Sequence, residues 1–153
     1  MLAQEPKTNL YNLQTKIFNL KNLQTLMPLL HNEFPQWNND QITKYINIIS
    51  QDNNNSGIII AKNNSDYYFG FLIFSIQTYD KKNYFVIENL NISLPFSNKP
   101  IIELLFNESV KLAKLKKCNQ IEFSKFQDFT DFILKKFRKK ISKLNDFQYL
   151  FKL

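Results

Sequence analysis

The segment YFVIENLNISL (residues 84–94) is followed by PFSNK (residues 95–99) and then by PIIELLFNESVKLAKLKK (residues 100–117). The first segment is rich in aromatic and β-branched side chains, which favour a strand. In the third, Pro100 suits the first position of a helix, and apolar residues recur at helical spacing as far as Lys117. We therefore predict a strand, a short loop and a helix in direct succession.

Two further strands precede this unit, at residues 57–62 and 67–79. Short polar turns separate the three strands, so we expect them to form an antiparallel meander. Gly70 interrupts the second strand, and a glycine at such a position predicts a bulge or a close approach of another backbone segment.

The remaining elements flank the meander on both sides. Residues 13–18 alternate as a strand does, and two amphipathic helices follow, one from Leu20 and one from Asn39 or Asp40. Pro28 inside the first helix predicts a kink or an early end. After residue 117 we expect a strand at 120–124, a helix at 129–137 and a terminal hairpin at 141–153.

The full order is β-α-α-β-β-β-α-β-α-β-β. It predicts an α/β (α+β) protein with a mixed central sheet of about six to seven strands flanked by about four helices. The chain has 153 residues, with no internal repeat and no linker-like segment. We therefore expect a single domain over residues 1–153, with residues 1–11 as a flexible N-terminus.

The net charge of +7 lies entirely in the last third of the chain. Residues 1–98 contain seven lysines and seven acidic residues, whereas residues 99–153 contain thirteen basic and six acidic residues. Such a surface suits an anionic partner. Nineteen of the twenty basic residues are lysine, and Arg138 is the exception. We favour a lysine-rich solvated face over nucleic-acid binding, because no RNA-binding or zinc-finger signature is present.

Several function classes are excluded by residue usage. The single cysteine, Cys118, cannot form an internal disulfide, which fits a reducing compartment. The polar N-terminus and the absence of a long apolar run argue against a signal peptide and a membrane span. We expect a soluble cytoplasmic protein with no membrane partner and no metal.

The quoted segments resemble a known family. Residues 87–92, the loop after them and residues 104–114 resemble the central strand, cofactor loop and following helix of the GNAT (N-acetyltransferase) superfamily. Residues 17–23 and 118–124 are similar to its first strand and helix and to its next strand. The resemblance spans nearly the whole chain. It implies an acetyl-CoA-dependent N-acetyltransferase whose acceptor is an amine on a small molecule or a protein.

The chain departs from the family in the loop that binds the cofactor pyrophosphate. That loop has the form Arg/Gln-x-x-Gly-x-Gly/Ala, because glycines let the backbone N–H groups approach a phosphate. Here the three signature positions fall on Ser97, Pro100 and Ile102, and none matches. Proline also lacks an N–H group. The resemblance is therefore to a divergent member with a degenerate acetyl-CoA pyrophosphate loop.

The resemblance implies the following site residues. Glu88 in the central strand is the candidate general base, acting directly or through a water, provided that it is partly buried. Phe34 and Trp37 could line the acceptor pocket or seal the edge of the core. The tyrosine that usually protonates the thiolate is replaced by Ile133, so solvent would have to act instead. The candidate cofactor-binding residues are Asn91, Ile92 and Leu94 in the strand and Ser97, Asn98, Lys99, Ile101 and Ile102 at the helix start.

Two other functions stay open. A GNAT-like protein that has lost cofactor binding would serve as a non-catalytic binding or interaction protein. A nucleic-acid binder that uses the basic last third is the weaker alternative. A homodimer is compatible with each of these functions.

Overall fold

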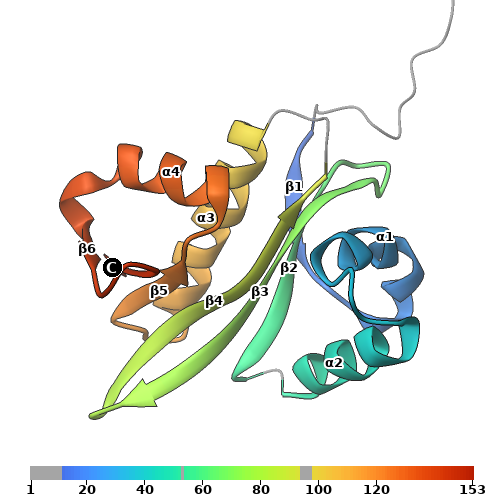
Figure 1. Cartoon of the computed structure of the whole chain (residues 1–153), viewed down its shortest axis with the longest axis horizontal. Helices are drawn as coiled ribbons and strands as arrows, with labels where there is room; N and C mark the ends of the chain where they lie inside the picture. The colour runs from blue at the N-terminus through green and yellow to red at the C-terminus, as the bar shows by residue number, and fades with distance from the viewer. Residues whose placement is uncertain (1–11, 53, 94–97) are drawn as a thin grey trace, which may run out of the picture.

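The computed structural model of the chain describes residues 12–52, 54–93 and 98–153. They form one seven-stranded mixed sheet in the order β1-β2-β3-β4-β5-β7-β6, with four α-helices (Figure 1). The fold class predicted from the sequence is thereby confirmed. The strands are β1 (Gln14–Ile17), β2 (Ser56–Lys62), β3 (Tyr68–Tyr79), β4 (Lys82–Ile92), β5 (Gln120–Ser124), β6 (Ile141–Lys143) and β7 (Gln148–Lys152). The helices are α1 (Leu23–Glu33), α2 (Asn39–Gln51), α3 (Asn98–Leu115) and α4 (Gln127–Lys136), with 3₁₀ turns η2 (Leu20–Asn22) and η3 (Arg138–Lys140).

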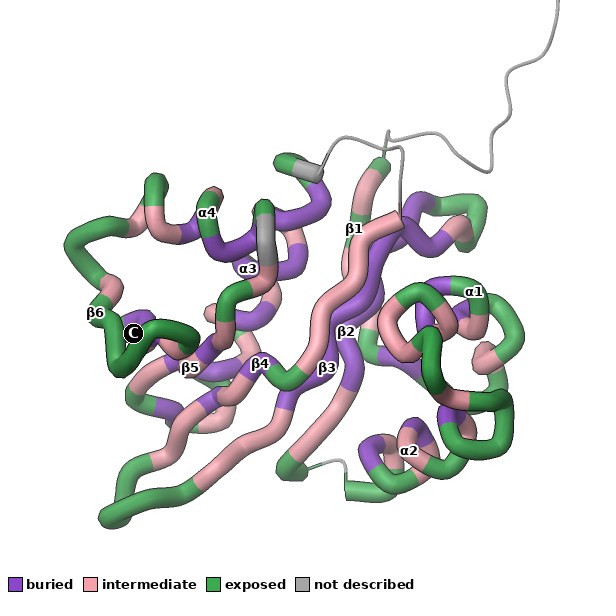
Figure 2. The backbone as a smooth tube through the Cα atoms, in the orientation of Figure 1, coloured by how far each residue is buried: buried purple, intermediate pink, exposed green. Residues whose placement is uncertain are grey.

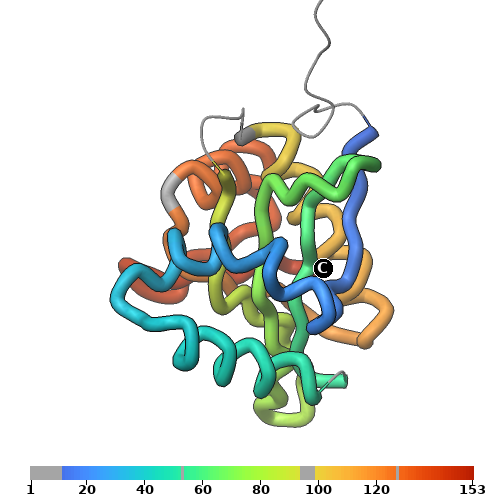
Figure 3. The backbone as a smooth tube through the Cα atoms, turned by 90° about the vertical axis from the view of Figure 1, so that its right-hand side faces the viewer, coloured from blue at the N-terminus to red at the C-terminus, as the bar shows by residue number. Residues whose placement is uncertain are grey.

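The sheet separates two hydrophobic cores. Helices α1 and α2 cover one face, and α3 and α4 cover the other (Figures 1 and 3). β3 lies between β2 and β4 and is buried from Tyr68 to Phe74, as the purple segment in Figure 2 shows. Phe71 and Ile73 pack on the side of α1 and α2, whereas Leu72 and Phe74 pack on the side of α3 and α4. A strand buried on both faces explains why its sequence is continuously apolar.

Tight turns fix the register of the meander. Asn63 accepts hydrogen bonds from the backbone N–H groups of Ser65 (2.9 Å) and Tyr67 (3.0 Å), which holds the β2–β3 turn. Asp80 and Lys81 connect β3 to β4 with positive φ angles of 49° and 65°. Two residues with positive φ match the right-handed twist of the flanking strands.

Two helices differ from the sequence prediction at Pro28 and Pro100. α1 continues through Pro28 to Glu33, with the proline exposed to solvent. α2 begins at Asn39, one of the two predicted positions, and the side chain of Asn38 before it forms a capping box with Gln41. α3 begins at Asn98 and not at Pro100. Proline is tolerated anywhere in a first helical turn, since the N–H groups there have no intrahelical partner. None of the described helices is long and apolar enough to cross a bilayer.

Gly70 lets β4 lie close to β3, which confirms the predicted close approach. A Cβ atom at this position would lie 2.9 Å from the carbonyl oxygen of Asn91 and 3.3 Å from a side-chain carbon of Ile92. The β2–β3 register also shifts between Ala61 and Lys62, directly opposite. A larger residue here would push β4 away from its partner.

We expect Gly70→Ala to lower the free energy of unfolding by about 1–3 kcal/mol, since the added methyl group meets a backbone atom that cannot move aside. Urea denaturation measures the loss. Gly57→Ala is the comparison, because its Cβ would meet the ring of Phe74, a side chain. An equal loss in both variants would contradict the assigned role of Gly70.

Candidate functional site

β4 and β5 diverge and leave an opening in the sheet. The two parallel strands pair only from Tyr84 opposite Gln120 to Ile87 opposite Phe123. β5 ends at Ser124, and within the described part of both strands no residue of β4 beyond Ile87 pairs with it. Figure 1 shows β4 running on past β5 toward the start of α3. The outer half of β4, from Glu88 to Ile92, therefore has backbone polar groups on the edge that faces away from β3.

Glu88 lies where the two strands part. The β3–β4 register passes from Ile73 opposite Asn89 to Phe74 opposite Ile87, so Glu88 is an extra residue in a β-bulge. Its carboxylate accepts a 2.7 Å hydrogen bond from the hydroxyl of Ser75. The side chain is exposed, so the partial burial that would favour a general base is missing from this structure.

A polar pocket of about 250 Å³ adjoins Glu88. Glu122 of β5 is a second carboxylate in its lining. Burial raises the pKa of Glu122, and the negative charge of Glu88 raises it further. The other polar side chains that line this pocket are Gln77, Tyr79, Ser124 and Gln148. A cationic group placed between the two carboxylates would relieve their mutual repulsion.

Glu33 brings a third carboxylate to β4 from α1. It accepts hydrogen bonds from the amide groups of Asn89 (3.2 Å) and Asn91 (3.5 Å). Burial raises the pKa of Glu33, and these two hydrogen bonds act in the opposite direction. Within the described residues, no three acidic, histidine or cysteine side chains gather closely enough to hold a metal ion. The carboxylates are thus spread along β4.

Tyr45 links the aromatic residues of the α1–α2 connection to β4. Its hydroxyl donates a 3.1 Å hydrogen bond to Asn89, and its ring makes edge contacts with Phe34 and Trp37. Burial, followed by the charges of Glu88 and Glu33, raises the pKa of Tyr45 to about 12. The phenol is therefore neutral at physiological pH.

Phe34 and Trp37 stack on each other with ring centroids 4.5 Å apart. They are partly buried against the core formed by α1, α2 and the sheet. Neither residue lines the polar pocket beside Glu88. Their position fits the sealing role, and a role in acceptor binding stays a prediction.

The predicted cofactor-binding residues divide into three groups. Asn91 and Ile92 lie on the part of β4 that pairs with β3 but not with β5, and the buried side-chain oxygen of Asn91 has no hydrogen-bond partner among the described residues. Leu94 and Ser97 lie outside the described residues. At the start of α3, the side chains of Ile101 and Ile102 are buried in the core, at 0% and 1% exposure. Of these two residues, only the backbone is therefore left to face a phosphate.

The first turn of α3 opens onto a groove of about 900 Å³ between α3 and α4. Lys99 stands exposed at its edge and makes no ion pair with any described residue. The groove carries balanced charge, because its lining includes three lysines and three acidic residues. Lys136 is paired with Glu103 at 3.2 Å. Ile133, which the sequence resemblance assigns to the tyrosine position of the family, is fully buried in the core.

Sequence reasoning missed four residues of this site: Glu33, Tyr45, Asn89 and Glu122. A signal existed for two of them, because Glu122 is a charged residue between two apolar ones in its strand and Asn89 is a polar residue inside a strand. Glu33 and Tyr45 gave no such signal. They lie on helices, and only the packing of α1 and α2 against β4 brings them to the bulge.

Glu122→Gln should stabilise the protein at pH 7. The raised pKa means that ionisation of Glu122 opposes folding once the pH exceeds the ordinary value near 4.5. Glutamine has no such penalty, so its advantage should appear as the pH rises and vanish below about pH 4. Urea unfolding of both proteins at pH 4 and 7 measures the difference. The gain should shrink in a Glu88→Gln background, and a gain independent of pH would contradict this electrostatic origin.

Comparison with known proteins places the fold. No protein-family model matches the sequence, and no curated protein matches it. Solved structures do match. An aminoglycoside N-acetyltransferase, AAC(6')-Iy, in complex with CoA aligns at a TM-score of 0.70 and 15% identity, over 81% of this chain and 85% of that one. The NatC complex bound to Gag peptide and CoA aligns at a TM-score of 0.68 and 12% identity, over 93% of this chain and 99% of that one. A GNAT family acetyltransferase of Staphylococcus aureus aligns at a TM-score of 0.65 and 16% identity, over 76% of this chain and 88% of that one. The chain therefore has the fold of the GNAT acetyltransferases.

Proposed function

We propose that this protein is an acetyl-CoA-dependent N-acetyltransferase that acts on a cationic amine. The observation that carries the proposal is the opening between β4 and β5, with the carboxylates of Glu88 and Glu122 beside the point where it begins. The structural neighbours in complex with CoA support the cofactor, and the Gag peptide bound to one and the name of the other, an aminoglycoside N-acetyltransferase, support an amine acceptor.

The chain fits the cofactor in part. Acetyl-CoA, when bound, would supply an acetyl group activated as a thioester. β5 does not pair with β4 at Asn91 and Ile92, so the edge of β4 that faces away from β3 can pair there with the amide groups of an extended arm, as an added strand does. The buried, unpartnered side-chain oxygen of Asn91 offers a further acceptor. The N–H groups of Asn98 and Lys99 and the charge of Lys99 would face the phosphates.

The pyrophosphate contacts are the weaker part of this fit. Pro100 contributes no N–H group to the first turn of α3, and no glycine is present there. We expect affinity for the cofactor to rest mainly on β4 and on Lys99. This same observation favours the second candidate function, a binding protein that no longer takes the cofactor.

In the proposed reaction Glu88 removes a proton from the attacking amine, directly or through a water. The amine nitrogen forms a bond to the acetyl carbon, the carbon–sulfur bond breaks, and the thiolate takes a proton from solvent. Because Glu88 is exposed, its carboxylate is open to a bridging water, and it accepts a hydrogen bond from Ser75, whose hydroxyl in turn accepts one from Gln77. Tyr45 stays protonated and fixes Asn89.

The acceptor arrives as an ammonium ion at neutral pH. Glu122 lies beside Glu88 in the polar pocket, and its disfavoured negative charge makes it a receptor for that cation. Glu33 extends the negative potential along β4 toward α1. An acceptor that carries a second positive charge therefore suits this surface. We place the reaction in the cytoplasm, since Cys118 is buried and free.

Calorimetry with acetyl-CoA and with CoA tests cofactor binding. We expect saturable binding of both ligands, weakened several-fold in Lys99→Gln because one phosphate contact is lost. Absence of saturable binding at millimolar ligand would leave the non-catalytic binding protein as the function.

Glu88→Gln should reduce the rate of acetylation of an amine panel by about 100-fold or more, because general-base catalysis contributes on this scale. Its affinity for CoA should stay unchanged. Glu108→Gln is the matched control, since Glu108 accepts a hydrogen bond from Thr15 on the far side of α3. A wild-type rate in Glu88→Gln would remove Glu88 as the base.

A diamine tests the acceptor class. We expect 1,4-diaminobutane to show a lower KM than butylamine, and Glu122→Gln to raise the KM of the diamine roughly threefold to tenfold, which corresponds to about one exposed charge pair. Steady-state kinetics at low and high salt measures both effects. Equal KM values for the two amines in the wild-type protein would contradict the role assigned to the carboxylates.

A further inference from the structure

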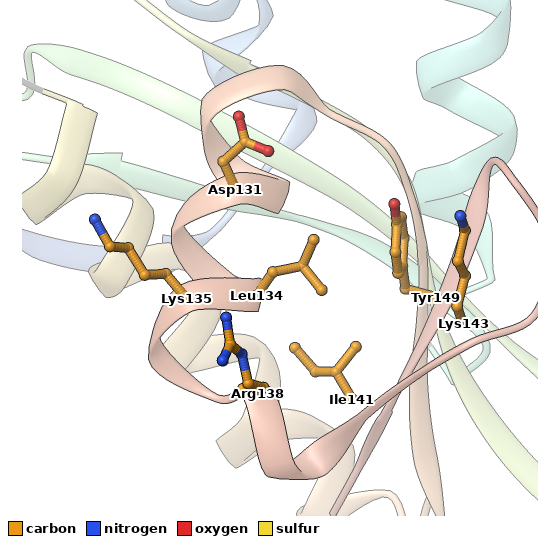
Figure 4. A pocket seen from close by; sticks show the side chains of 7 residues that line it. All are labelled: Asp131, Leu134, Lys135, Arg138, Ile141, Lys143 and Tyr149. Carbon is orange, nitrogen blue, oxygen red and sulfur yellow. The ribbon is translucent and has the colours of Figure 1, made fainter.

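Another pocket lies between α4 and the C-terminal hairpin (Figure 4), and its lining shares no residue with the polar pocket beside Glu88. Its volume is about 480 Å³, which is enough for a small organic molecule. α4, η3, β6 and β7 supply its walls. Asp131 and Lys135 border both this pocket and the groove between α3 and α4, so the two hollows are neighbours.

The floor of the pocket is apolar and rigid. It consists of Leu134, Ile141 and the ring of Tyr149. Tyr149 stacks on Phe123 of β5, with ring centroids 5.5 Å apart and planes at 21°. Because Tyr149 belongs to a strand paired on both sides, its ring cannot easily swing out of the floor. A flat or aliphatic group would lose water contact against these three side chains.

The rim of the pocket is mainly basic. Lys135, Arg138 and Lys143 belong to the lining, with the Lys135 amine pointing away from the floor in Figure 4, and Asp131 is the one acidic residue in the lining. Lys143 forms a salt bridge with Asp146, with 3.7 Å between Nζ and Oδ1. Arg138 forms no salt bridge with any of the described residues. An organic anion would therefore find an unneutralised guanidinium beside the apolar floor.

The identity of residue 138 adds to this argument. Nineteen of the twenty basic residues in the chain are lysine, and the single arginine lines this pocket. Arginine presents a planar fork of N–H donors that binds a carboxylate or a phosphate with two parallel hydrogen bonds, which lysine cannot do. The chain thus has its one bidentate oxyanion binder at the rim of an apolar pocket.

We propose that this pocket binds a small organic anion, with a carboxylate or phosphate head on Arg138 and an apolar body on Leu134, Ile141 and Tyr149. Lys135 and Lys143 add long-range attraction. This site is independent of the proposed acetyl transfer, because it uses none of the residues around Glu88. Extended polyanions are disfavoured, since the recognised unit is a single pocket with an apolar floor.

Amide NMR titrations of the full chain with three probes test the proposal. Phenyl phosphate carries both head and body, inorganic phosphate carries the head alone, and benzyl alcohol carries the body alone. We expect phenyl phosphate to bind at least about tenfold more tightly than either of the others, since burial of a ring contributes on that scale. The shifted amides should map to residues 131–143 and 149. Equal affinity for phenyl phosphate and inorganic phosphate would overturn the proposal.

Paired variants separate a built site from general attraction to a basic surface. Arg138→Gln should weaken phenyl phosphate binding about tenfold, and Arg138→Lys should restore only part of it. Lys139→Gln is the matched control, because it removes the same charge from η3 but does not line the pocket. Retained amide spectra show that each variant is folded. An equal loss in Lys139→Gln, or displacement of phenyl phosphate by CoA, would refute the separate site.

Discussion

The unequal pairing of β4 with its two neighbours is the constraint on which the rest of the site depends. β4 pairs with β3 at ten positions but with β5 at only four. β3 can hold β4 firmly because it is buried on both faces and because Gly70 admits the β4 backbone at close range. β5 is only five residues long, so the outer half of β4 is left with an open edge inside the sheet. Such an edge normally invites a strand-like partner.

The bulge at Glu88 converts this open edge into a chemical site. One extra residue breaks the alternation of β4, so the charged side chain of Glu88 is exposed directly after the buried Ile87. Glu33 and Glu122 then approach from α1 and β5, and both have a raised pKa because burial disfavours their charge. The fold thus tolerates electrostatic repulsion that a cationic ligand would relieve. Perturbed groups of this kind are typical of functional sites.

The basic character of the last third of the chain takes a more local form in three dimensions. Part of the excess is neutralised, as in the pair of Lys136 with Glu103 between α4 and α3. The groove beside the start of α3 is balanced in charge. Unneutralised charge is found instead at Arg138, beside the apolar floor of the pocket next to the C-terminal hairpin. Net charge by itself therefore says little about where an anion would bind.

The order and type of the elements follow from local sequence patterns. The continuous apolar run of β3, the helical spacing of α2 and the polar turns of the meander each express a local periodicity, which a single segment carries within itself. Residues 120–124 were placed as a strand with the bounds that β5 has. Helix ends were less accurate, because Pro28 and Pro100 are compatible with helical positions as well as with breaks.

The site, in contrast, is formed by contacts between elements that are distant in the chain. The bulge at Glu88 depends on the register between β3 and β4, and the opening depends on where β5 stops pairing. Glu33 and Tyr45 come to β4 from helices that lie more than forty residues away in the chain. These relations arise from the packing of whole elements against each other, and no local pattern of residues encodes them.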